Sequence, residues 1–198
     1  MSVPPLGPWA ELVAMGTRQA MSGLSRMLGS DIDVTSLTLR RVPITEMSGP
    51  LGGLDAEIVW IYLAVSGSVE GHLVFLYEPR IACGFIDLLM DRPRRTTRTI
   101  DAMGYSALGE MGNIVGASFL AAIADATGMS LSPSPPMVMR DNVRTLLHVF
   151  ATDILTSRRE TYLAEATLIT RSHDIAGVFM VMPTEELLNV QPAASRVA

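Results

Sequence analysis

An internal repeat is the feature that most constrains the fold of this chain. Residues 10–29 align without a gap to residues 109–128, at an offset of 99 residues. In this alignment Glu11 meets Glu110 and Gly29 meets Gly128. Both segments have apolar residues at helical spacing, and each ends at a glycine, the residue that commonly follows a helix. The chain is therefore predicted to fold as two similar halves.

Strand-like segments follow each predicted helix. The segment that begins at Gly71 also matches the one that begins at Gly177, now at an offset of 106. Seven extra residues must then lie between the second helix and the last strand. Segments rich in β-branched and aromatic residues are typical of strands. They are residues 58–65 and 72–77 in the first half, and residues 144–150, 162–170 and 177–182 in the second.

A short helix is predicted to close each half, at residues 79–90 and 184–190. Sequential antiparallel strands beside helices are typical of the α+β class. We predict one continuous sheet flanked by helices, in a single domain over residues 1–198, with the halves related by a pseudo-twofold axis. Its predicted parts are pseudo-repeats at about 8–90 and 101–190, a linker at 91–100 and a tail at 191–198.

The composition indicates an ordered intracellular protein. With 198 residues, 48% hydrophobic and 18% charged, the chain is long enough to bury a core. A net charge of -5 argues against nonspecific nucleic-acid binding. The first seventeen residues carry no basic side chain, and the apolar segment 111–127 contains Asn113 and Asp125. We therefore expect neither a signal peptide nor membrane insertion, and a cytoplasmic location.

Several classes of catalytic chemistry are excluded by the residues that the chain lacks. All fifteen basic residues are arginine, which excludes lysine-based catalysis. The single cysteine, Cys83, excludes an intrachain disulfide, and its apolar neighbours favour a small buried side chain over a reactive thiol. His72, His148 and His173 have no cysteine or histidine at metal-ligand spacing, so no metal site is expected. His72 and His148 lie in apolar runs and are expected to be satisfied sheet residues.

Arginines are concentrated in the predicted linker, at Arg92, Arg94, Arg95 and Arg98. One interpretation is a contact with an acidic partner. The other is a solvated loop, in which the charges have no partner.

Two faces are distinguishable on the helix predicted at 101–127, at about 100° per residue. An apolar stripe of Met111, Val115, Phe119 and Ala122 is predicted to be buried. Ser106, Glu110 and Asn113, at i, i+4 and i+7, lie within about 60° of each other on another face. A carboxylate and an amide presented together make a candidate site. An ordinary exposed helix face would carry the same residue types.

Small residues beside this face favour the functional interpretation. Gly109, Gly112 and Gly116 are predicted to leave the helix backbone open to close approach by another molecule. The extended segment 132–136, which contains three prolines, follows the helix and could support its exposed face.

The segment SALGEMGNIVG, followed by a proline, resembles the CheC phosphatase family of bacterial chemotaxis, which also includes CheX and FliY, and it is most similar to CheC. The family pattern is Asp or Ser, three residues, Glu, two residues, Asn, twenty-two residues and Pro. This chain has Ser106, Glu110, Asn113 and Pro136 at those positions. The length and the duplicated organisation also resemble CheC.

The first copy departs from the family pattern. The equivalent positions there are Gly7, Glu11, Ala14 and Leu37. Ala14 has neither a donor nor an acceptor with which to orient a water. We therefore expect one working site in the second copy and a vestigial one at Glu11 and Ala14.

The resemblance implies dephosphorylation of the aspartyl phosphate on a CheY-like response regulator. Glu110 would pair with a lysine of the regulator, and Asn113 would hold a water in line with the phosphorus. The Mg²⁺ would belong to the regulator, so the chain would need no cofactor of its own. Positioning of this kind is the main source of catalysis in phosphoryl transfer.

A non-catalytic role is the alternative. The chain could be an adaptor that binds a response regulator or a CheD-like deamidase, a partner that the resemblance also implies. It could also be part of the flagellar switch, although FliY-like proteins carry a further C-terminal domain for which this chain is too short.

Overall fold

The structure is a computed structural model that describes residues 7–29, 32–43, 46–153, 160–170 and 174–183. The predicted helix at 184–190, the predicted tail at 191–198 and His173 lie outside these residues.

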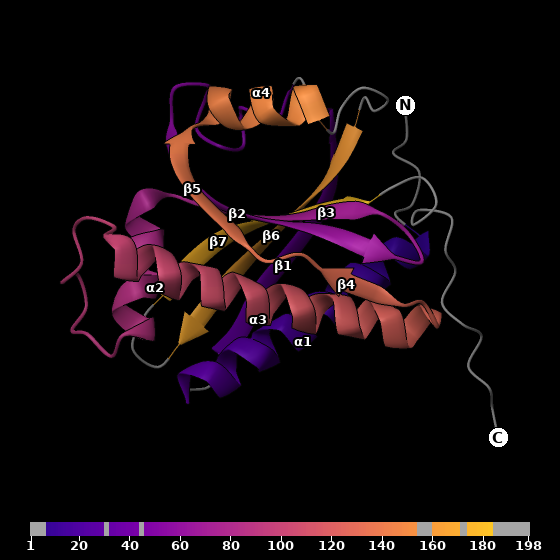
Figure 1. Ribbon diagram of the computed structural model, residues 1–198, viewed down its shortest axis with the longest axis horizontal. Coiled ribbons are helices and arrows are strands. Elements are labelled where there is room, and N and C mark those ends of the chain that lie inside the picture. The colour runs from indigo at the N-terminus through magenta and orange to yellow at the C-terminus, as the bar shows by residue number, and fades with distance from the viewer. Residues whose placement is uncertain (1–6, 30–31, 44–45, 154–159, 171–173, 184–198) are drawn as a thin grey trace.

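Seven strands form one sheet in which every described pairing is antiparallel (Figure 1). The order is β1-β6-β7-β3-β2-β4, and β5 also pairs with β2. The strands are β1 (Ile32–Pro43), β2 (Glu57–Gly67), β3 (Gly71–Tyr77), β4 (Leu131–Pro133), β5 (Met137–Asn142), β6 (Glu160–Thr170) and β7 (Asp174–Pro183). With helices packed on it, this sheet confirms the predicted α+β class and the continuous sheet.

Helices cover both faces of the sheet (Figure 1). On one face lie α1 (Gly7–Leu28), α2 (Pro79–Leu89) and α3 (Ala102–Thr127), and on the other lies α4 (Val143–Asp153). Successive side chains along β2 point to opposite faces of the sheet, so β2 contributes to the hydrophobic cluster on each face. Val59, Ile61 and Leu63 belong to the cluster beneath α1 and α3, whereas Ile58 and Trp60 belong to the cluster beneath α4.

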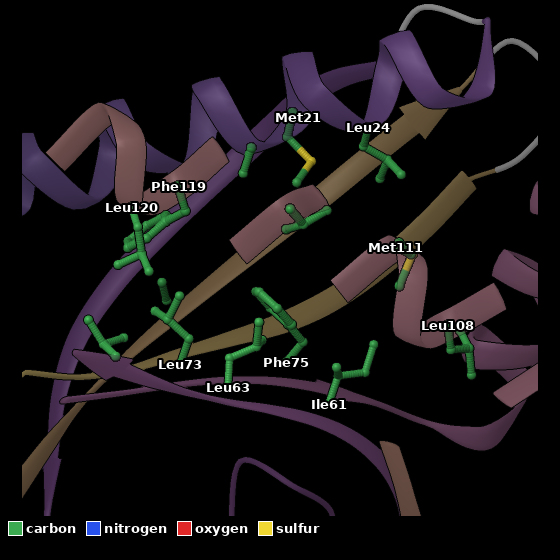
Figure 2. Packing of buried hydrophobic residues seen from close by; sticks show 14 of the residues in the cluster. Met21, Leu24, Ile61, Leu63, Leu73, Phe75, Leu108, Met111, Phe119 and Leu120 are labelled. Carbon is green, nitrogen blue, oxygen red and sulfur yellow. The ribbon is translucent and has the colours of Figure 1, made fainter. Parts of the chain in front are cut away.

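The long helix α3 is buried on two sides. Figure 2 shows Leu108, Met111, Phe119 and Leu120 of this helix pointing toward the sheet residues Ile61, Leu63 and Phe75. Phe119 also lies against Gly16 of α1, 2.7 Å from the position that a Cβ would take there. Of the predicted buried stripe, Met111, Val115 and Phe119 are buried and Ala122 is half-buried. By length and composition α3 would suffice to cross a membrane, but its packing is that of a core helix.

One predicted strand is wrong, because residues 144–150 lie in the helix α4. The backbone N–H of Thr145 donates to Oδ1 of Asn142 at 2.9 Å, the pattern of a helix N-cap. Val143 and Leu146, three residues apart, are both buried, as helical spacing requires. His148 is therefore an exposed helix residue and not a sheet residue. His72 does lie in the sheet, with its Nδ1 2.9 Å from the Tyr62 hydroxyl.

Strand registers repeat between the two halves. Residues 32–43 pair with 170–160, and residues 131–142, which lie 99 positions later, run along β2 from Gly67 to Glu57. The order β1-β6-β7-β3-β2-β5 also has an internal symmetry. If β1, β2 and β3 are exchanged for β5, β6 and β7, the same order is obtained when the sheet is read from its other edge.

The two hairpins also have matching registers. In the first hairpin Val65 pairs with Gly71, and in the second Leu168 pairs with Ile175. Leu168 lies 103 positions after Val65, and Ile175 lies 104 positions after Gly71. Because the pairings with β1 and β5 set the offset between β2 and β6 at 103, the last strand has an offset of 104, two residues less than the value of 106 from the sequence match. An even shift keeps each side chain on the same face of the sheet, so the sequence match could not detect it.

Candidate functional site

The helix that carries the candidate site is fixed at both ends. Asp101 is the N-cap residue, and its side chain accepts a hydrogen bond from the backbone N–H of Gly104 at 2.8 Å. Gly128 ends the helix with φ 72°, the left-handed conformation that glycine adopts at low cost. Between these caps the helix packs on the sheet, so the backbone beneath the site is rigidly held.

Ser106, Glu110 and Asn113 are all exposed on one face of α3. The Ser106 hydroxyl donates to the carbonyl of Ala102 at 3.1 Å, so it is engaged within the helix. Within the part of the chain that the structure describes, the side chains of Glu110 and Asn113 form no hydrogen bond or ion pair. A carboxylate and an amide three positions apart on a helix are neighbours, so a partner would meet both together.

Apolar side chains stand at the edges of this face. Met103, one turn before Ser106, is 61% exposed. Ala117, one turn after Asn113, is also exposed. Small and apolar side chains therefore lie on the same helix face as the polar pair, a composition suited to contact with another protein.

Pro136 lies beside the turn of α3 that precedes Glu110. It is 3.9 Å, and Val138 is 3.7 Å, from the position that a Cβ would take on Gly109. The segment before it is anchored to β2, because Ser134 N–H donates to the carbonyl of Ala64 and the Ala64 N–H donates to Oγ of Ser134. Pro136 has no N–H for the sheet, so the edge strand is divided into β4 and β5 at this point.

Two of the three glycines do not lie on the open face, and the prediction for them is wrong. Gly112 and Gly116 are buried against the sheet. A Cβ on Gly112 would lie 2.5 Å from Cγ2 of Ile61, and one on Gly116 would lie 3.1 Å from Leu63. The molecule that approaches the helix backbone at these glycines is this chain's own strand β2. Only Gly109 of the three lies at the edge of the exposed face.

The equivalent face of α1 has a different chemistry. Glu11 is exposed, and Ala14 is half-buried. Leu37 lies in the unbroken strand β1, paired with Ala166. Arg18 is exposed at the position where α3 has Ala117, so this face carries a guanidinium group where α3 carries a methyl group.

A buried carboxylate that the sequence analysis did not single out organises the loop before α3. Asp87 is fully buried, and it accepts hydrogen bonds from the backbone N–H groups of Thr96 at 3.0 Å and Thr97 at 2.8 Å. Burial alone would raise the pKa of Asp87, but hydrogen bonds from Thr97, Thr96 and Arg95 outweigh it and hold the pKa below its ordinary value. A carboxylate in the last turn of a helix interacts unfavourably with the helix dipole. The position of Asp87 near the end of a predicted helix was therefore the sequence feature that could have identified it.

Cys83 is half-buried, and not fully buried as predicted. Burial raises the pKa of its thiol, although nearby Arg140 acts in the opposite direction. The thiol is therefore protonated at neutral pH and is a poor nucleophile. Among the described residues no three histidine, cysteine, aspartate or glutamate side chains form a group that could hold a metal ion.

Comparison with known proteins points to one family. The profile of the CheC-like family matches residues 103–140, the segment that holds Glu110, Asn113 and Pro136. The CheY-P phosphatase CheC of Bacillus subtilis (strain 168) is 31% identical over 133 residues, which cover 66% of this chain and 64% of that protein. The alignment thus spans slightly less than two thirds of the relative's length.

Two solved structures share the fold. The crystal structure of Thermotoga maritima FliY matches with a TM-score of 0.75 and 22% identity, over 95% of this chain and 94% of that one. CheX in the CheX-CheY-BeF3-Mg²⁺ complex from Borrelia burgdorferi matches with a TM-score of 0.53 and 17% identity, over 89% and 98%. At these identities the two likenesses establish the fold alone.

Proposed function

We propose that the chain is a member of the CheC-like family, whose profile it matches, and that it removes the phosphoryl group from the aspartyl phosphate of a CheY-like response regulator in chemotaxis or a related two-component pathway. Its one active site would be Glu110 and Asn113 on α3. The observation that carries the proposal is that these two side chains are exposed together, with no hydrogen bond or ion pair to any described residue. A relative of similar sequence is a CheY-P phosphatase, and a protein of this fold has been crystallised with CheY.

The chemistry proposed for each side chain follows from its functional groups. The Glu110 carboxylate would pair with a cation on the regulator and so orient α3 against it. The Asn113 amide has both a donor and an acceptor, so it can hold a water in line with the phosphorus without changing its own charge. The Mg²⁺ that neutralises phosphoryl charge would be held by the regulator.

Ser106 and Pro136 would support the site without touching the phosphoryl group. The Ser106 hydroxyl is engaged with Ala102, and Pro136 lies against the turn at Gly109. Their effect would be to fix the helix turn that presents Glu110.

The direct test is to mix the protein with a phosphorylated regulator and follow loss of the phosphoryl group. Removal of one preorganised hydrogen-bonding group typically costs about 10²–10³ in rate, so Asn113→Ala is expected to lose most activity. Glu110→Ala is expected to weaken binding of the regulator as well. If both variants retain the wild-type rate, the active site lies elsewhere.

The first copy supplies a matched control. Glu11 is exposed at the position equivalent to Glu110, so Glu11→Ala makes the same change on α1. With one active site, this variant keeps the wild-type rate. Ala14→Asn would restore the missing amide on α1. If it adds activity to the Asn113→Ala variant, the α1 site has the correct geometry and lacks only this side chain.

A non-catalytic adaptor is the second candidate. The exposed Met103, on the same helix face as the polar pair, would serve protein binding whether or not a water is activated. An adaptor would bind the regulator, or a CheD-like deamidase, without increasing the rate of phosphoryl loss. A binding assay beside the kinetic assay separates the two functions.

We also propose that the chain is a duplicated single domain with a pseudo-twofold axis through the β3–β7 pair, and that it acts in the cytoplasm. The support for the duplication is the repeat of strand registers, since 131–142 lies against β2 as 32–43 lies against β6.

A further inference from the structure

One cavity of about 660 Å³ lies between α2, the 91–100 loop and β5. Its volume is in the range of roughly 300–1,000 Å³ that small-molecule sites occupy. One third of the chain's fifteen basic residues line it, although the chain as a whole carries a net charge of -5. These residues are Arg80, Arg94, Arg95, Arg98 and Arg140.

The loop that supplies three of these arginines is held in place. The buried Asp87 carboxylate accepts the backbone N–H groups of Thr96 and Thr97. Arg95 lies at φ 63°, a conformation that few residues other than glycine adopt. The backbone that carries these arginines is therefore organised before any ligand arrives.

The same three arginines have no carboxylate partner among the described residues. Arg140 forms a bidentate pair with Glu57, with both N···O distances 2.9 Å, and Arg80 is 3.9 Å from Glu78. In the described part of the chain Arg94, Arg95 and Arg98 form no ion pair. Asp87, the one carboxylate that lines the cavity, is already occupied by the loop backbone.

Helix α2 forms one wall of the cavity, and at Gly84 no side chain fills the space above this wall. A Cβ on Gly84 would have no heavy atom within 4 Å, although the glycine lies within a helix that packs on the core. Ile81 and Cys83 line the cavity beside it. The empty volume therefore reaches the helix backbone, as a space for a compact ligand would.

We propose that this cavity binds a small polyanion of the phosphate-ester class, with Arg94, Arg95 and Arg98 donating to its phosphate oxygens. Arginine presents a planar fork of donors that matches phosphate geometry, and three such groups without a described carboxylate partner require more than one negative charge. An acidic protein segment could pair with the same arginines, but it would leave the open space above Gly84 unfilled. The site is separate from Glu110 and Asn113, and it does not depend on the proposed phosphatase activity.

Calorimetric titration with pyrophosphate and with ATP tests the proposal. Saturable binding to one site is expected, and it should weaken when salt is raised from about 0.05 to about 0.3 M because salt screens the charges. Cys83 is the chain's single cysteine and lines the cavity, so its alkylation at mildly alkaline pH should slow when the site is full. Absence of saturable binding by either probe would overturn the proposal.

Variants distinguish the cavity from general surface charge. Arg94→Gln with Arg98→Gln should weaken binding at least about tenfold, since each loses a charge-assisted hydrogen bond. Arg18→Gln with Arg26→Gln on α1 removes the same charge elsewhere and should leave binding unchanged. An equal loss in both pairs would show nonspecific attraction and refute the site.

Gly84→Leu keeps every charge and places a side chain in the space above α2. It should weaken binding of both probes, while its thermal unfolding shows that the protein still folds. If Gly84→Leu binds as the wild type does, or if a glutamate-rich peptide binds and neither phosphate probe does, the cavity is not a small-molecule site and the proposal fails.

Discussion

Gly112→Ala is predicted to destabilise the protein, although alanine is the better helix former. A Cβ at this position would lie 2.5 Å from Cγ2 of Ile61, whereas carbon atoms at their best separation are about 3.5–4.0 Å apart. The helix and the strand would have to separate by about 1 Å. Ile61 is fully buried and β-branched, so its side chain cannot turn away.

The magnitude is the difference of two opposing effects. Overpacking of a core costs about 1–3 kcal/mol, and a contact this short between stiff groups belongs at the upper end. Replacement of glycine by alanine within a helix raises the free energy of unfolding by about 1 kcal/mol, which offsets part of this cost. The net loss in the free energy of unfolding is therefore about 2 kcal/mol.

Gly109→Ala on the same helix is the matched control. Its Cβ would lie 3.7 Å from Val138 and 3.9 Å from Pro136, which is ordinary contact. With no clash, the same substitution should raise the free energy of unfolding by about 0.5–1 kcal/mol. Urea denaturation followed by circular dichroism measures both variants. Two shifts of the same sign, or a more stable Gly112→Ala, would refute the packing of α3 on β2 described above.

Three further outcomes follow from single residues. Asp87→Asn should cost about 2–4 kcal/mol, because two backbone N–H groups lose a charged acceptor, and urea denaturation measures it. The folded-state pKa of Asp87 is lowered, so its contribution is present above the unfolded pKa of about 4 and is lost as pH falls through the folded value. The wild type should therefore lose more stability than Asp87→Asn between neutral pH and acid, and parallel pH profiles would contradict the assignment. Gly67→Ala should destabilise by about 2 kcal/mol or more in thermal denaturation, because φ is 126° and the new Cβ would collide with the carbonyl of Ser130; an unchanged melting temperature would show that this turn can rearrange. Phe119→Ala, which empties the contact between α3 and α1, should cost about 3–5 kcal/mol by the same assay, and a loss below 1 kcal/mol would indicate that the helices close the gap.

Local patterns in the sequence predicted the parts of the fold that depend on neighbours along the chain. Helical spacing and a terminal glycine identified α3 and α1, and alternating β-rich runs identified β2, β3, β6 and β7. Glu110 and Asn113 could be predicted to share a helix face because three positions along a helix place two side chains together whatever lies beneath it. The repeat predicted that both halves would use the same elements.

Tertiary structure decided which faces are buried and which segments meet. Nothing near Gly112 in the sequence reveals that Ile61 lies against it, and the apolar run at 144–150 suits a strand or a helix equally until Asn142 caps it. The arginines of the 91–100 loop acquire a cavity only because α2 and β5 lie beside them. Periodicity is a property of adjacent residues, whereas contact between distant segments depends on how the whole chain packs. The residues that present the site could therefore be predicted from the sequence, and the surfaces that support it could not.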